Sequence, residues 1–176
     1  EGKQAHGSTP WDGLDANEML MRTLGNLRND YPYFDINSGK PENTWIDTMH
    51  AAKIGGGEVS NIISGNAYAL LDFRLTENST VAGLEENLKK ACMPGVKYEI
   101  VSVSTPVVMR EDNPQILAYK ALAEKVMERG IKFVQIGGAT DARLFAEKGA
   151  TVIMHSGTGE GMHAEGEYVV LQSVEE

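Results

Sequence analysis

His163 is the residue of this sequence that best fits a metal ligand. It lies in the segment 161–167 (GMHAEGE), with carboxylates two and four positions later at Glu165 and Glu167. An imidazole flanked by carboxylates can ligate a transition metal, and the carboxylates then act as further ligands or as hydrogen-bond partners. From spacing alone, a solvated or locally hydrogen-bonded histidine is the favoured interpretation, and a metal ligand is the alternative.

Two other polar residues, His6 and Asn61, stand in short segments rich in small or polar residues. His6 stands in the segment 5–8 (AHGS), where it could donate a hydrogen bond to a developing oxyanion or only cap the end of a sheet. Asn61 lies in the segment 58–61 (EVSN) and is by default a turn residue. Residue type alone leaves a functional and a structural interpretation open for His6, and the turn is the interpretation of Asn61.

Arg74 could recognise a carboxylate. It follows Asp72 by two residues on the polar side of a segment that alternates between apolar and polar positions. A guanidinium in a sheet is costly unless it is paired with a carboxylate, and its planar fork can bind the Asp72 carboxylate through two hydrogen bonds. The ion pair is the default interpretation.

The elements that must position these residues follow a recognisable order over residues 1–104. The periodicity and capping residues predict, in order, a strand over 2–8, a helix from Asp15 to about Asn29, strands over 45–54 and 67–75, a helix over 81–91 and a strand over 97–103. A polar loop is predicted over 35–43. The order strand, helix, strand, strand, helix, strand predicts a ferredoxin-like lid: a four-stranded antiparallel sheet with both helices on one face.

A different pattern begins at about residue 107. Asn113, Pro114 and Gly130 bracket a predicted helix, followed by a strand over 132–136, a helix over 141–148 and a strand over 151–155. This rhythm predicts a partial α/β segment over 107–176 that belongs to a larger sheet. The predicted fold class is therefore α+β, with a domain boundary near 104–112.

Composition narrows the class of protein. The 176 residues include 16 Lys and Arg against 25 Asp and Glu, a net charge of -9, which disfavours nucleic acid and anionic membranes as partners. The single cysteine, Cys92, excludes an internal disulfide and is interpreted as a small apolar residue near a helix end. No apolar run reaches the ~20 residues of a membrane span, and no export leader is recognised, so we expect a cytoplasmic protein without membrane contact.

Five segments together resemble the co-catalytic zinc amidohydrolase and peptidase family. This family includes acetylornithine deacetylase, succinyl-diaminopimelate desuccinylase, aminoacylase and several dipeptidases. The segments are AHGSTP at 5–10, GG at 55–56 with SNII at 60–63, LDFR at 71–74, GGATDAR at 137–143, and His163 with Glu167. They occur in the family's order and approximate spacing, and they cover nearly the whole chain.

The resemblance implies a two-domain enzyme that binds two zinc ions, or cobalt, and forms a homodimer. Residues 1–104 are then the lid used for dimerisation, and residues 107–176 the C-terminal part of the catalytic domain. His163 matches a metal ligand and Glu167 a carboxylate that supports it. His6 matches the lid histidine that polarises the scissile carbonyl in the partner's active site.

The resemblance also implies a substrate with a free carboxylate. Asn61 and Arg74 match lid residues that bind the substrate's carbonyl and carboxylate, and Gly157 is expected at the substrate. The implied reaction is hydrolysis of the amide bond of an N-acyl amino acid or dipeptide.

The chain departs from the family pattern in one major respect. A His-x-Asp strand motif and paired glutamates, one of them the general base, precede the lid in the family and are absent here. Near His163, Glu165-Gly166 stands where the family often has Pro-Asn. We therefore expect a fragment that is inactive alone and binds zinc weakly. The alternative is a non-catalytic ferredoxin-like dimerisation or small-ligand-binding module.

Overall fold

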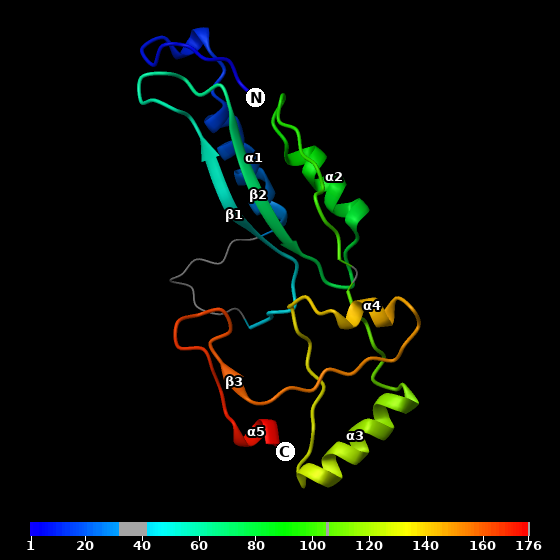
Figure 1. Cartoon of the computed structure of the whole chain (residues 1–176). Helices are drawn as coiled ribbons and strands as arrows, with labels where there is room; N and C mark the ends of the chain where they lie inside the picture. The colour runs from blue at the N-terminus through cyan, green and yellow to red at the C-terminus, as the bar shows by residue number, and fades with distance from the viewer. Residues whose placement is uncertain (32–41, 105, 176) are drawn as a thin grey trace. The chain divides into compact units, whose positions relative to one another are not determined.

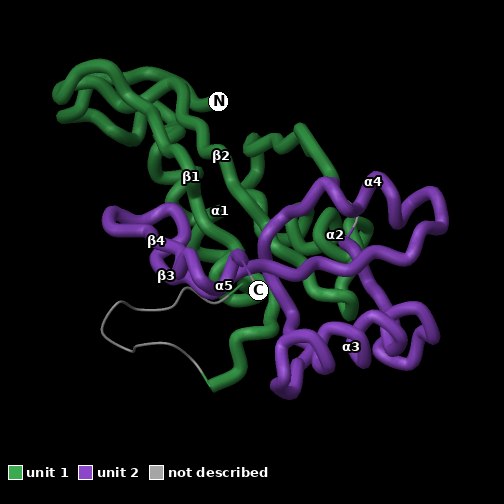
Figure 2. The backbone as a smooth tube through the Cα atoms, turned by 60° about the horizontal axis from the view of Figure 1, so that its bottom comes forward, with its two compact units in different colours: residues 1–103 green, residues 104–176 purple. Residues whose placement is uncertain are grey.

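The chain forms two compact units. A computed structural model describes residues 1–31, 42–104 and 106–175, so most of the predicted loop over 35–43 lies outside the described residues. Unit 1 is Glu1–Val103 and unit 2 is Ser104–Glu176 (Figure 2). No helix in the described ranges is long and apolar enough to cross a membrane.

A long antiparallel hairpin is the centre of unit 1 (Figure 1). Strand β1 (Thr48–Gly56) pairs with β2 (Ala67–Arg74) in a register that runs from Gly56 opposite Ala67 to Thr48 opposite Arg74. The register shifts between Ala51 and Lys53, which is a β-bulge. Along β2, partly covered side chains alternate with exposed ones, so the predicted two-faced strand is confirmed.

Both predicted helices of unit 1 are present. Helix α1 (Ala16–Asp30) begins at Asp15, whose carboxylate accepts two N–H groups of the first turn. Helix α2 (Val81–Ala91) begins at Thr80, whose hydroxyl accepts the N–H of the third helical residue. Cys92 follows α2, half-buried and free, and burial raises the pKa of its thiol.

The core of unit 1 lies between the two helices and one face of the hairpin. Its buried residues are Leu27, Tyr31, Met49, Leu88 and Ala91, with Leu71, Phe73, Leu75 and Leu84 packed around them. The ring of Tyr31 meets that of Phe73 edge to face, with 5.1 Å between centroids. Leu27 is completely buried, so the apolar stripe of α1 faces the hairpin.

The predicted four-stranded sheet is wrong for the described residues. Residues 97–103 form no strand, and residues 2–8 form only two isolated bridges, Lys3 with Leu14 and His6 with Ile62. Alternating apolar residues predict an extended chain, but they do not specify which edge it pairs with. In the described residues of unit 1, the sheet is therefore the two-stranded hairpin.

Unit 2 contains short elements. In order they are α3 (Pro114–Met127), α4 (Ala142–Ala146), β3 (Gly159–Glu160), β4 (Tyr168–Val169) and α5 (Gln172–Glu175). The side chain of Asn113 caps α3 by accepting the N–H of Gln115 at 2.9 Å, as predicted. The sequence predicts that the helix ends just before Gly130, but α3 ends earlier, at Met127. The next residue, Glu128, adopts a left-handed conformation with φ 49°.

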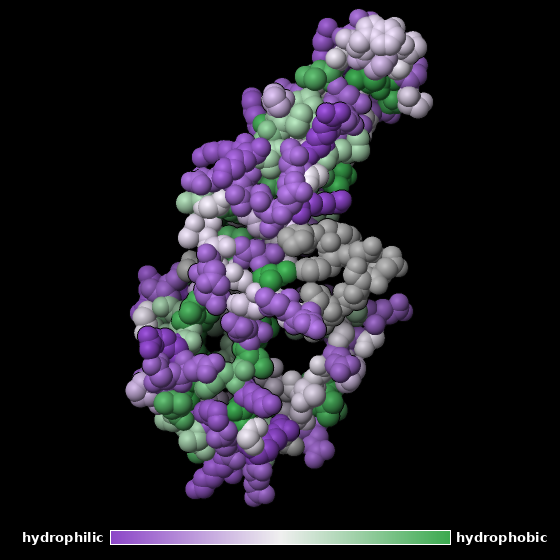
Figure 3. Space-filling model, turned by 180° about the vertical axis from the view of Figure 1, so that it is seen from behind, coloured by the Kyte–Doolittle hydropathy of each residue, from purple (hydrophilic) through white to green (hydrophobic). Residues whose placement is uncertain are grey.

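The strands predicted over 132–136 and 151–155 are not formed: both segments lack regular secondary structure and ladder partners in the described chain. A parallel strand is stable only when flanking strands satisfy its backbone groups, and among the described residues of unit 2 the one sheet, β3 with β4, pairs with neither segment. Apolar side chains stay exposed there, including Val134 at 77% and Phe145 at 64%. Figure 3 shows hydrophobic residues scattered over the visible surface.

Candidate functional site

His6 and Asn61 lie on adjacent segments of unit 1. His6 bridges to Ile62, the N–H of Gly7 donates to the carbonyl of Asn61 at 2.7 Å, and the N–H of Ile63 donates to the carbonyl of Ala5 at 2.8 Å. A Cβ on Gly7 would lie 3.1 Å from the carbonyl oxygen of Asn61, so the absence of a side chain permits this close approach. The structure thus brings together two predicted site residues that are far apart in the sequence.

The imidazole of His6 is exposed, and its contacts with Ser8 are made through one ring nitrogen, Nδ1. Its Nδ1 accepts the N–H of Ser8 at 3.1 Å and lies 2.7 Å from the Ser8 hydroxyl oxygen. The His6 carbonyl accepts the N–H of Thr9 at 2.9 Å, which closes a four-residue turn. Within residues 1–31, 42–104 and 106–175, Nε2 has no hydrogen-bond partner. Ser8 was not singled out from the sequence, although its position two residues after a histidine was available as a signal.

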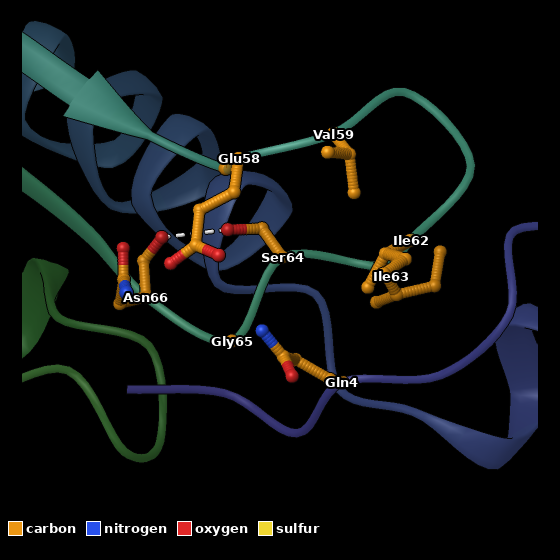
Figure 4. A pocket seen from close by; sticks show the side chains of 9 residues that line it. Gln4, Glu58, Val59, Ile62, Ile63, Ser64, Gly65 and Asn66 are labelled. Carbon is orange, nitrogen blue, oxygen red and sulfur yellow. Dashed lines mark hydrogen bonds between the residues drawn. The ribbon is translucent and has the colours of Figure 1, made fainter.

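A small cavity lies beside the segment that carries Asn61 (Figure 4). It has a volume of about 10 Å³ and is lined by Gln4, Glu58, Ile62 and neighbouring residues of the loop. This space is at the lower limit for one water molecule, so it is not a substrate pocket. The hydroxyl of Ser64 donates to the carbonyl of Asn66 at 2.6 Å and helps hold the loop.

Arg74 lies at the opposite end of the hairpin from Asn61. Its Nε and Nη2 donate to the two carboxylate oxygens of Asp72 at 2.7 and 3.0 Å, the default ion pair from the sequence. The guanidinium keeps its Nη1 edge open within the described residues, and half of the side chain is exposed. Arg74 can therefore bind a second carboxylate while Asp72 holds it.

Asp47 organises the end of the hairpin that carries Arg74. Its Oδ1 accepts the N–H of Thr76 at 2.7 Å and the Thr76 hydroxyl at 2.9 Å, and its Oδ2 accepts the Ser79 hydroxyl. Burial alone would raise the pKa of Asp47, but the bonds from Ser79 and Thr76 outweigh it and hold that pKa below its usual value. This carboxylate joins the chain before β1 to the chain after β2.

His163 and Glu167 lie in the turn between β3 and β4. His163 has a positive φ of 62°, between Gly161 and Gly166, which also have positive φ angles. The Glu167 carboxylate accepts the backbone N–H of His163 at 3.2 Å. Glu167 thus supports the backbone, whereas the resemblance implied support of the ligand itself. Gly166 has a φ of 86°, in the left-handed region that glycine adopts without steric cost.

Gly157 packs against the end of the chain. A Cβ there would lie 2.9 Å from the side chain of Val174 and 3.0 Å from the Ser173 hydroxyl oxygen. The neighbouring N–H of Thr158 donates to that hydroxyl at 2.7 Å. Close packing is therefore one reason for glycine at this position.

The described residues do not make a complete metal site. No three His, Cys, Asp or Glu side chains come together in them in a way that could hold an ion. A catalytic zinc takes three protein ligands, and His163 with one supporting carboxylate falls short of that number. His163 could serve only as one member of a ligand set completed by other residues.

Residues 1–97 match the model of the M20 peptidase dimerisation domain. The chain is 27% identical, over an alignment 194 positions long with gaps included, to an uncharacterized metallohydrolase of Methanocaldococcus jannaschii. It is 24% identical, over an alignment 180 positions long, to succinyl-diaminopimelate desuccinylase of Wolinella succinogenes. Both alignments cover 99% of this chain and 47% of the relative, so the chain spans about half the length of these curated relatives.

Solved structures share the fold. Aminopeptidase PepT of Bacillus cereus superposes with a TM-score of 0.66 at 19% identity, covering 99% of this chain and 46% of that one. A tripeptidase of Staphylococcus aureus gives 0.68 at 16% identity, covering 99% and 45%. The fold similarity therefore extends over both units. Together with the domain match over more than half of the residues, it establishes that the chain belongs to the M20 peptidase family and carries that family's dimerisation domain.

Proposed function

We propose that this chain is the lid and the C-terminal catalytic segment of a metal-dependent hydrolase that cleaves the amide bond of an N-acyl amino acid or a dipeptide. The observation that carries the proposal is the junction of residues 5–7 with 61–63, which presents His6 and Asn61 together. Membership of a peptidase family and the hydrolase names of the curated relatives support it.

The proposed division of labour follows from the donors that each residue offers. Nε2 of His6 donates to the scissile carbonyl as negative charge develops on its oxygen, and the Asn61 side chain donates to a substrate carbonyl. Arg74 binds the free carboxylate through its open edge. Gly157 is proposed to border the substrate, with backbone groups as its only means of contact.

The geometry of the hairpin favours a site shared by two copies of the chain. Strand β2 separates Arg74 from the loop that carries Asn61, and the steps from Ala67 to Arg74 span roughly 23 Å at about 3.3 Å per step. A dipeptide spans only about 7 Å. One copy therefore cannot place both His6 and Arg74 on the same substrate, and a homodimer provides the second copy.

We propose zinc, or cobalt, as the metal, with His163 as one ligand and Glu167 holding its backbone. The other ligands and the general base belong to a part of the enzyme outside this chain, in agreement with the half-length alignments. When bound, the metal supplies an activated water for hydrolysis. The complete enzyme is proposed to be cytoplasmic and to bind neither nucleic acid nor membranes.

The test is the activity of the complete gene product. It is purified, loaded with zinc or cobalt, and assayed against N-acyl amino acids and dipeptides, with carboxyl-amidated versions of each substrate as the matched control. Hydrolysis of the free acids with at least a tenfold lower kcat/KM for the amides is expected, because Arg74 loses its partner. A complete, metal-loaded, dimeric protein without hydrolase activity would favour the non-catalytic module.

A further inference from the structure

We infer that Ser8 is a positioning residue that holds the ring of His6 with its proton on Nε2, the nitrogen that faces outward. The inference rests on the proposed function of His6. Ser8 has no role in the chemistry proposed above. The inference follows from two contacts that Ser8 makes with Nδ1 of His6.

The backbone of Ser8 decides which ring nitrogen carries the proton. The N–H of Ser8 lies 3.1 Å from Nδ1 of His6 and points toward it. A backbone N–H can only donate, so Nδ1 must offer a lone pair. In the neutral ring the proton is therefore on Nε2.

The hydroxyl of Ser8 adds a second donor to the same nitrogen. Its oxygen lies 2.7 Å from Nδ1. A hydroxyl can donate or accept, but Nδ1 already acts as an acceptor, so the hydroxyl proton points to the ring. A ring held by two donors on one nitrogen is restricted in orientation as well as in protonation.

This arrangement matches what an oxyanion donor requires. The opposite tautomer would direct the Nε2 lone pair, in place of an N–H, at a developing negative charge. The His6 backbone is fixed independently, by the bridge to Ile62 and by the turn that its carbonyl closes with Thr9. The hydroxyl of Ser8 thus acts on the ring and contributes little to the path of the chain.

The first experiment measures the tautomer directly in the 176-residue chain. Two-bond ¹H–¹⁵N spectra of chain labelled with ¹⁵N-histidine, recorded in alkaline buffer where imidazole is neutral, distinguish the protonated ring nitrogen from the bare one. The His6→Ala variant assigns the His6 signals. We expect the Nε2–H form in the unmodified chain.

The matched variants isolate the hydroxyl, because the N–H of residue 8 remains in all of them. Ser8→Ala should lower the ratio of the Nε2–H to the Nδ1–H form by about three- to tenfold, the usual worth of one hydrogen bond. Ser8→Thr keeps a hydroxyl and should restore the ratio. Thr9→Val is the control, because it removes a hydroxyl from the same turn that does not contact the ring. The Thr9 hydroxyl oxygen lies 3.5 Å from the His6 carbonyl oxygen, so this variant should leave the ratio of the two tautomers unchanged.

The second experiment links the tautomer to catalysis in the complete enzyme. Ser8→Ala should lower kcat by about three- to tenfold with little change in KM, and Ser8→Thr should restore kcat. A proton on Nδ1 in the unmodified chain, or a ratio unaffected by Ser8→Ala, would overturn the inference. An altered ratio with unchanged kcat would also overturn it. A separate measurement tests the proposed function of His6. If the His6→Ala enzyme kept full activity, that proposed function would be wrong, whatever the tautomer ratio.

Discussion

The backbone N–H of Gly7 donates to the carbonyl of Asn61 at 2.7 Å, and this hydrogen bond joins the two segments that carry the proposed carbonyl-binding side chains. Arg74, at the far end of β2, belongs to a different part of the same unit. The proposed site takes His6 and Asn61 from one copy and Arg74 from another, so we expect activity to require dimerisation.

His6→Ala in the complete enzyme should lower kcat by roughly 10²–10³, because one oxyanion donor is lost. Metal content and folding should not change. The decisive measurement mixes two inactive variants, His6→Ala and His163→Ala, and allows their subunits to exchange. In a mixed dimer, one site combines an intact His6 from one chain with an intact His163 from the other, so a fraction of activity should return. No recovery in dimers shown to be mixed would contradict a role of His6 across the interface.

Arg74→Ala should raise KM at least tenfold and change kcat less, because anchoring a carboxylate is shared by the ground and transition states. The KM of Arg74→Lys should lie between that of the unmodified enzyme and that of Arg74→Ala, since an ammonium group cannot bind a carboxylate bidentately. Arg110→Ala is the matched control: Arg110 is also exposed and donates to Asp112, two residues away, at 2.9 and 2.6 Å. Equal effects on KM in both variants would show that the loss reflects general surface charge.

Asp47→Asn should lower the free energy of unfolding by about 1–3 kcal/mol, because three donors lose a charged acceptor. The pKa of Asp47 is lower in the folded chain than in the unfolded one. Its stabilising contribution is therefore complete above about pH 3.9, the unfolded value, and is lost as the pH falls through the folded pKa. Urea titrations at several pH values should show a shallower loss of stability in acid for Asp47→Asn. Asp112→Asn, which alters an exposed pair, should have almost no effect at neutral pH.

Leu27→Ala should destabilise unit 1 by about 2–5 kcal/mol, because it opens a cavity at the completely buried position of the core. Leu70→Ala provides the control on the outer face of β2, where Leu70 is 51% exposed, and should cost less than about 0.5 kcal/mol. Denaturant unfolding, followed by a spectroscopic signal that reports on unit 1, measures the free energy of unfolding of both variants. A similar loss for the two variants would contradict the assigned inner and outer faces of the hairpin.

The 176-residue chain alone should bind zinc weakly and hydrolyse no amide. Its described residues bring together no three candidate ligands, and a catalytic zinc takes three protein ligands. Equilibrium dialysis against zinc, with His163→Ala as the reference, should give nearly the same low occupancy for both chains. Stoichiometric zinc that survives dialysis, or turnover of a dipeptide, would show that the ligand set is complete within this chain.

Local signals in the sequence determined the helices and the hairpin. Asp15 and Thr80 cap α1 and α2, and the alternation over 67–75 describes β2 correctly, because capping and side-chain periodicity depend on neighbouring residues. The five family-like segments were also sufficient to identify the family, since their order along the chain is a property of the sequence alone.

Pairing between distant segments was decided only by the tertiary structure. Residues 97–103 alternate like a strand, yet they join no sheet in the described chain. Residues 132–136 and 151–155 likewise stay unpaired. An extended segment becomes a strand only when another edge satisfies its N–H and C=O groups, and the sequence does not name that edge.

The same distinction applies to the candidate site. Residue types indicated His6, Asn61 and Arg74 as candidates, but their spacing in the sequence did not reveal that the first two are adjacent and the third lies at the other end of β2. The contacts of Ser8 with the His6 ring were equally invisible, because they depend on the turn that residues 6–9 adopt. The sequence determines the chemistry of each side chain, whereas the distances between side chains are determined only when the backbone folds.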